Sequence, residues 1–229
     1  MTPVPSEAVP SKQVTEALRD VTERLGGFFA LDTTPTQGPR GARLTHAGLA
    51  ERSKAVNDRY ATAEPRIGAS IAHLGLAARL WSPVLACALV HGIVPVMSAV
   101  EWSGEGSTLR LPRPEGRRAA DPAVLADEVY AEVDGVLAAV ESGLTIKVAP
   151  RLLAGNSASA LVGSAAQLLR VSPDLRPELA RLTRELLETG RLRGTGRITG
   201  PSLTFRRHSC CLFYRAPNGG KCGDCCLVR

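Results

Sequence analysis

The stretch DPAVLADEVYAEVDGVLAAVESG, from Asp121 to Gly143, decides the fold class of this chain. Its apolar residues recur every three or four positions, which is the spacing of one face of an α-helix. Asp121-Pro122 supplies a cap and a first-turn proline, and Gly143 ends the pattern. The apolar stripe consists of Val124, Leu125, Val129, Val133, Val136, Leu137 and Val140. We therefore predict an amphipathic helix packed on a core.

Similar patterns on both sides extend this prediction to most of the chain. Further helices are expected at residues 11–25, 45–61, 65–90 (kinked or broken at Pro83), from 156 or 157 to 170, and from 172 to 190. Short strands are expected at 93–102 and 107–111, joined as a hairpin through residues 103–106, and also at 144–148 and 202–206. Residues 112–120 are expected to be a polar linker. The fold class predicted is α+β and predominantly helical, with a small antiparallel sheet.

One apolar stretch raises the question of a membrane. Residues 80–100 contain no Asp, Glu, Lys or Arg, which is long enough to span a bilayer. Pro83, Gly92 and Pro95 interrupt the stretch, so a buried helix followed by a buried strand is favoured. No transmembrane span is expected, and peripheral membrane association is left open. Because residues 1–12 lack an apolar signal region, we expect a cytoplasmic protein.

Cysteines gather at one end of the chain. Five of the six lie in the last twenty residues, as Cys210-Cys211, Cys222 and Cys225-Cys226. In a cytosolic protein, such clustering indicates metal binding, because disulfides are disfavoured there. Zinc sites use ligand pairs separated by two to four residues, which an adjacent pair fits poorly. The spacing therefore favours a [2Fe–2S] cluster on Cys210, Cys211, Cys222 and Cys225. Two alternatives are less favoured: Cys226 could replace Cys225 as a ligand, or His208 could be a ligand of the Rieske type.

The sequence around these cysteines is similar to a known family. Arg207-His-Ser-Cys-Cys-Leu-Phe-Tyr-Arg215, followed by Cys222-Gly-Asp-Cys-Cys-Leu227, resembles the C-terminus of the FhuF-like ferric-siderophore reductases. The resemblance covers about residues 205–227, where the four cysteines match that family's C-C-x10-C-x2-C motif. It implies a [2Fe–2S] cluster and one-electron reduction of ferric iron held by a siderophore. We accordingly divide the chain into a mainly helical domain, residues 1–204, and a C-terminal [2Fe–2S]-binding segment, residues 205–229.

The net positive charge of the protein is concentrated in the part of the chain that contains the clustered cysteines. The net charge is +6, and residues 191–229 alone hold eight basic residues and one acid. We expect Arg206, Arg207, Arg215 and Lys221 to balance the cluster's charge and to dock an anionic partner. No dinucleotide fingerprint is found, so electrons are expected from a ferredoxin or a flavin-dependent reductase.

Two other functions stay open at this point. The basic end also suits a zinc-loop nucleic-acid-binding protein, although no basic recognition helix lies near the cysteines and no nucleic acid is expected. A cluster-based redox or iron sensor would carry the same ligands without turning over a substrate.

Overall fold

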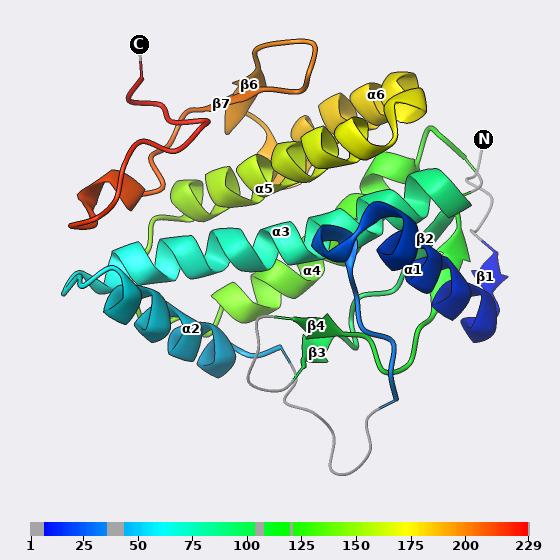
Figure 1. Cartoon of the computed structure of the whole chain (residues 1–229), viewed down its shortest axis with the longest axis horizontal. Helices are drawn as coiled ribbons and strands as arrows, with labels where there is room; N and C mark the ends of the chain where they lie inside the picture. The colour runs from blue at the N-terminus through cyan, green and yellow to red at the C-terminus, as the bar shows by residue number, and fades with distance from the viewer. Residues whose placement is uncertain (1–6, 36–43, 104–107, 120, 229) are drawn as a thin grey trace.

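The computed structural model describes residues 7–35, 44–103, 108–119 and 121–228 (Figure 1). Within these residues it is a helical protein with small antiparallel sheets, which confirms the predicted fold class. The helices are α1 (Ser11–Leu25), α2 (His46–Arg59), α3 (Pro65–His91), α4 (Leu125–Glu141), α5 (Pro150–Val171) and α6 (Arg176–Leu187). Short 3-10 turns are η1 (Gly27–Phe29), η2 (Pro173–Leu175), η3 (Gly190–Leu192) and η4 (Phe213–Arg215).

Helix α3 is the centre of the molecule. It packs against α1, α2, α4 and α5, which surround it in Figure 1. Trp81 is fully buried on α3, and its indole N–H donates to the Ser157 hydroxyl of α5 at 3.0 Å. The helix continues through Pro83, where we expected a kink or break. Every residue from 80 to 88 is buried, so tertiary packing outweighs the cost of about 3 kcal/mol that proline imposes on a helix interior.

The burial of α3 and α5 also bears on the membrane question. Both helices are long and apolar enough to cross a bilayer by length and composition. However, 67% of the apolar window of α3 and 78% of that of α5 lie inside the protein. Such burial is typical of core helices in a folded domain, as the sequence predicted for residues 80–90.

The small sheets pair differently from the predicted hairpin. β3 (Glu101–Trp102) pairs with β4 (Leu109–Arg110), as expected, although residues 104–107 near the turn lie outside the described residues. β2 (Ile93–Pro95) instead pairs with β5 (Gly116–Arg118), which also pairs with β1 (Ala8–Val9). The prediction of a linker at 112–120 was therefore wrong for β5. That strand is three residues long and holds two arginines, so it shows no hydrophobic alternation to detect.

Two further boundaries are corrected by the structure. Helix α5 begins at Pro150, six residues before the predicted start, and the described residues 144–148 form no strand. Gly155, Asn156 and Ser157 are loop-forming residues in isolation, but all three are buried in α5. Asn156 and Ser157 form hydrogen bonds with Ser70 and Trp81 of α3, and Gly155 faces Ser209. The predicted last strand is β7 (Phe205–Arg207), which pairs with β6 (Gly196–Ile198). This pairing crosses the proposed boundary at residue 204, and the division into two domains stays a prediction.

Candidate metal centre

The cysteine segment, residues 208–228, lies against the first halves of α3 and α5 (Figure 1). β7 leads into this segment, and η4 forms its outward bend. The Ser70 hydroxyl of α3 donates to the carbonyl of Cys211 at 2.7 Å, and the Ser159 hydroxyl of α5 bonds the carboxylate of Asp224. Both core helices therefore hold the cysteine segment in place.

The four predicted ligands lie on this segment as free thiols. Cys211 and Cys225 are buried and Cys210 and Cys222 are half-buried, with 3.5 Å between the sulfurs of Cys211 and Cys222. The Leu212 N–H donates to the Cys210 sulfur at 3.3 Å, in a left-handed backbone conformation with φ of 68°. Hydrogen bonds of this kind, from backbone N–H to sulfur, tune the potential of iron–sulfur clusters.

The donor set fits a two-iron cluster. Within the described ranges, no group of three or more His, Cys, Asp or Glu side chains has the geometry to hold a single metal ion. A two-iron cluster sets a different requirement, because its four thiolates are shared between two irons. The Leu227 N–H donates to the Cys225 sulfur at 3.4 Å, so the second cysteine pair has the same type of support as the first. Soft thiolates supported by backbone N–H groups are the chemistry that such a cluster requires.

Burial affects the pKa of two of these thiols, Cys222 and Cys210. Burial raises the pKa of the Cys222 thiol, and the neighbouring Asp224 and Cys211 raise it further. Burial also raises the pKa of Cys210, partly offset by the hydrogen bond from the Leu212 N–H. Both shifts disfavour thiolate unless a positive group is nearby. Metal binding at these thiols is therefore coupled to proton release.

A buried arginine lies next to this site. Arg207 is 1% exposed, although we expected it to dock a partner as well as to balance the cluster's charge. Its Nη2 donates to the Asn156 side-chain oxygen at 2.7 Å, and the Asn156 amide donates to the Ser70 hydroxyl at 3.1 Å. Ser70 in turn bonds Cys211, so a continuous network runs from the guanidinium to the cysteine segment.

The charge of Arg207 has no carboxylate partner within the part of the chain that the structure describes, and its Nε and Nη1 atoms form no hydrogen bond there. A buried cation without a counter-charge is costly. Arg207 is linked to the cysteine segment through Asn156 and Ser70, and its burial makes it better suited to balance negative charge inside the protein than to meet a partner protein.

The other predicted docking residues do reach the surface. Arg206 is half-buried and donates to the Cys225 carbonyl at 3.4 Å. The Arg215 side chain is 43% exposed and pairs with Glu64 at 2.9 Å, next to the start of α3. Lys221 is exposed in the turn before Cys222. Their role in docking stays a prediction.

The alternatives to the predicted ligands have other surroundings. Cys226 is half-buried beside Cys225 and stays available as a substitute ligand. The His208 Nδ1 lies 2.9 Å from the Gly194 carbonyl and must carry the proton there, because a carbonyl only accepts. No role was predicted from the sequence for Ser70 and Asn156. The signal that could have identified them is that each is a polar residue in an apolar helix, where a buried polar group needs a hydrogen-bond partner.

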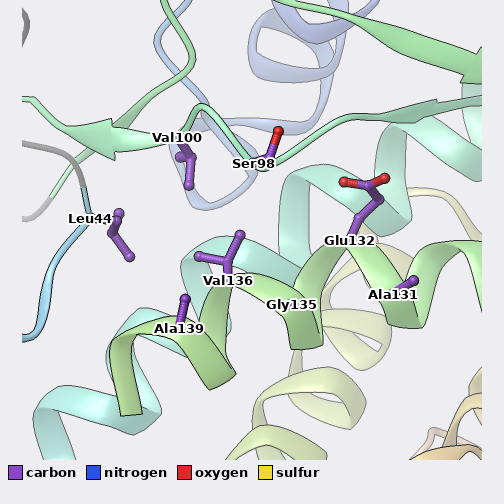
Figure 2. Close-up of a pocket in the computed structure, with 8 residues that line it drawn as sticks. All are labelled: Leu44, Ser98, Val100, Ala131, Glu132, Gly135, Val136 and Ala139. Atoms are coloured by element: carbon purple, nitrogen blue, oxygen red, sulfur yellow. The ribbon is translucent and has the colours of Figure 1, made fainter. Parts of the chain in front are cut away.

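A pocket elsewhere shows no link to the cysteines. It has a volume of about 380 Å³ and lies between α4 and the segment from β2 to β3 (Figure 2). Its acidic residue, Glu132, accepts from the Met97 N–H at 2.8 Å and pairs with Arg117. Because that carboxylate is already satisfied, the pocket offers no free charged group for chemistry.

Comparison with known proteins agrees with this geometry. Residues 207–227 match the family model described as the FhuF 2Fe-2S C-terminal domain. The match includes all four predicted ligands and confirms the resemblance drawn from the sequence; it points to a [2Fe–2S] cluster. No curated protein and no solved structure matches the chain. The C-terminal segment is therefore similar to an iron–sulfur domain that carries a [2Fe–2S] cluster.

Proposed function

We propose that this protein is a cytoplasmic ferric-siderophore reductase that delivers one electron to siderophore-bound Fe(III). The match of residues 207–227 to the FhuF 2Fe-2S C-terminal domain is the observation that carries the proposal. Siderophores hold Fe(III) through hard oxygen donors, and these donors hold Fe(II) far less tightly. Adding one electron to the iron therefore releases it from the chelate.

We assign the cluster to Cys210, Cys211, Cys222 and Cys225. When bound, a [2Fe–2S] cluster supplies one-electron chemistry. The chain's own residues set the conditions for it: N–H groups of Leu212 and Leu227 donate to sulfur, and the Arg207 guanidinium places a positive charge nearby. Both effects favour the state with more negative charge. No acid–base residue is required for the electron transfer itself.

Electrons are proposed to come from a separate protein, a ferredoxin or a flavin-dependent reductase. The chain has no dinucleotide fingerprint that would bind a nicotinamide cofactor. Lys221 is exposed and Arg206 is half-buried, both within a few residues of the cysteines, and the exposed Arg215 is paired with Glu64. An acidic donor would be attracted to the positive charge of Lys221 and Arg206, more strongly at low salt.

The experiment is purification without air, followed by a turnover assay. We expect a reddish-brown protein with about two irons and about two acid-labile sulfides per chain. With a ferredoxin system it should reduce a ferric siderophore, measured by trapping Fe(II) with a ferrous-specific chelator, whereas NADPH alone should not. Colourless protein with stoichiometric zinc would contradict the proposal, and a loaded cluster without turnover would instead support a sensor.

A further inference from the structure

A second pocket lies directly against the cysteine segment. Its volume is about 440 Å³, within the range of roughly 300–1,000 Å³ that small-molecule sites occupy. Arg151 and the first turns of α5 form one wall, residues 191–195 form another, and His208 with Ser209 form the third. Since Ser209 is bonded to Cys210, anything bound in this pocket lies next to the proposed cluster.

The charged side chains that line this pocket are arginines. Arg151, Arg191 and Arg193 all contribute to it, and no Asp or Glu does. Arg191 is held from behind by Asp134 and Glu141, and Arg193 makes a weak surface pair with Glu188 at 3.7 Å.

Arg151 provides the charge that is not already balanced. Its side chain is exposed, and its guanidinium has no hydrogen-bond or ion-pair partner among the described residues. The Arg193 side chain is 71% exposed, and its Nε and Nη2 atoms donate to the Glu188 carbonyl at 3.0 and 2.7 Å. Arg151 is therefore free to meet a negatively charged ligand, and Arg193 adds an exposed positive charge to the same pocket.

The walls of the pocket are fixed relative to the cysteines. The His208 N–H donates to the Thr195 carbonyl at 2.8 Å, and its ring bonds the Gly194 carbonyl. The Ser209 hydroxyl donates to the Arg151 carbonyl at 3.2 Å, and Gly155 leaves no room for a side chain between α5 and Ser209. Because its Nδ1 is committed, His208 has Nε2 left for a ligand.

We propose that this pocket binds the substrate, and that the substrate is an anionic ferric chelate with catecholate or carboxylate oxygens. This inference rests on the proposed function and adds the class of siderophore and its site. The pocket receives the metal-bearing face of the chelate, with Arg151 and Arg193 against its negatively charged oxygens. The iron then lies beside the residue that precedes Cys210, where one electron need cross only the pocket wall. A neutral trihydroxamate chelate would gain nothing from these arginines.

The test uses gallium(III) chelates, because Ga(III) has the charge of Fe(III) but does not accept an electron under these conditions. Binding of an anionic Ga(III) tricatecholate to the cluster-loaded protein is measured by calorimetry without air, beside a neutral Ga(III) trihydroxamate. Arg151→Gln combined with Arg193→Gln should raise the Kd for the tricatecholate about tenfold and flatten its salt dependence. The visible spectrum should be unchanged.

Arg170→Gln is the matched control, since Arg170 is an exposed arginine near the other end of α5. Its Kd should equal that of the wild type. An unchanged Kd in the double variant, or an equal loss in Arg170→Gln, would overturn the pocket assignment. If wild type reduces a ferric trihydroxamate but binds no tricatecholate, the pocket inference fails and the reductase stands. If it neither binds nor reduces any chelate, the proposed function fails as well.

Discussion

At the scale of single residues, Arg207 is a buried side chain with unsatisfied hydrogen-bond donors. Its guanidinium is buried, and two of its nitrogens form no hydrogen bond among the described residues. Arg207→Met removes this positive charge while keeping an unbranched side chain. We expect the cluster's midpoint potential to fall by tens of millivolts, since about 59 mV corresponds to 1.4 kcal/mol for one electron.

A spectroelectrochemical titration measures this potential. Arg206→Gln is the control, because Arg206 is half-buried and should shift the potential less. Arg207→Lys should restore part of the loss, as it keeps the charge without the planar guanidinium. Equal potentials in wild type and Arg207→Met would show that Arg207 does not balance the cluster.

The ligand assignment makes a second prediction at this scale. Serine at any one of Cys210, Cys211, Cys222 or Cys225 should abolish or strongly reduce iron and sulfide content, measured after anaerobic reconstitution. Cys226→Ser and Cys87→Ser should stay loaded. Cys87 is fully buried in α3, and burial raises its pKa to about 12, so it is a core residue and not a ligand. Loss of colour in Cys226→Ser but not in Cys225→Ser would shift the assignment to Cys226.

At the scale of secondary-structure elements, the contact between α5 and the cysteine segment depends on Gly155. A Cβ at this position would overlap the Ser209 hydroxyl and come within 3.1 Å of Arg207 Nη2. We therefore expect Gly155→Ala to displace the segment from α5 and to lower both cluster content and melting temperature.

Gly163→Ala provides the matched control on the same helix. Apart from the neighbouring backbone of its own helix, no described atom lies within 4 Å of a Cβ placed there, so alanine should leave cluster content unchanged. Replacing a helical glycine should even stabilise the protein, by up to about 1 kcal/mol. Iron content per chain and thermal unfolding by circular dichroism distinguish the two variants. Normal loading in Gly155→Ala would show that the segment does not need this close contact.

The same elements show how far sequence alone could predict this protein. α1 and α4 follow hydrophobic periodicity and α3 is apolar over nearly its whole length, so all three were predicted within a few residues. The start of α5 was missed because its small and polar residues face a close neighbour, and only the tertiary contact makes them helical. β5 was missed because its pairing joins β1 and β2, which are distant in the chain.

The candidate site divides in a similar way. The four cysteines could be found because metal ligands follow local spacing rules. The burial of Arg207, its link to Asn156 and Ser70, and the arginine-lined pocket come from three separate parts of the chain. No local pattern encodes such contacts, so the role of Arg207 was predicted only from its charge and its place in the sequence beside the cysteines.

At the scale of the whole molecule, a buried charge network joins α3, α4 and η3. His73 and Arg191 both bond the carboxylate of Glu141, and Arg191 also pairs with Asp134. Burial would raise the pKa of Glu141, but the hydrogen bonds and charges of His73 and Arg191 outweigh it and leave the pKa below the ordinary 4.5. A carboxyl whose pKa is lowered by folding adds stability above its unfolded pKa, and this contribution is lost as the pH falls through the folded pKa.

We therefore expect the free energy of unfolding to fall with acidification below about pH 4.5. Glu141→Gln should remove this part of the pH dependence and cost about 3 kcal/mol at neutral pH, since it leaves Arg191 and His73 without their shared partner. Glu185→Gln, which breaks an exposed pair with Arg181, should cost less than about 1 kcal/mol. Urea titrations from pH 3 to 7 measure both variants. A parallel pH profile in Glu141→Gln would exclude Glu141 as the titrating group.

The bond between Trp81 and Ser157 has an optical consequence. The sequence contains two tryptophans. Trp81 bonds Ser157 of α5, which is the residue after Asn156. Trp102 stacks under Arg52, with 3.3 Å between the guanidinium carbon and the ring centre. Indole emission overlaps the broad absorption of an iron–sulfur chromophore, so energy transfer should dim the fluorescence when the cluster assembles. In Trp81→Phe only Trp102 would emit, so comparison with the wild type would show how much of the fluorescence change comes from Trp81. The rigid core of this protein thus contains a fluorophore that can report, in real time and without labelling, whether its iron has been inserted.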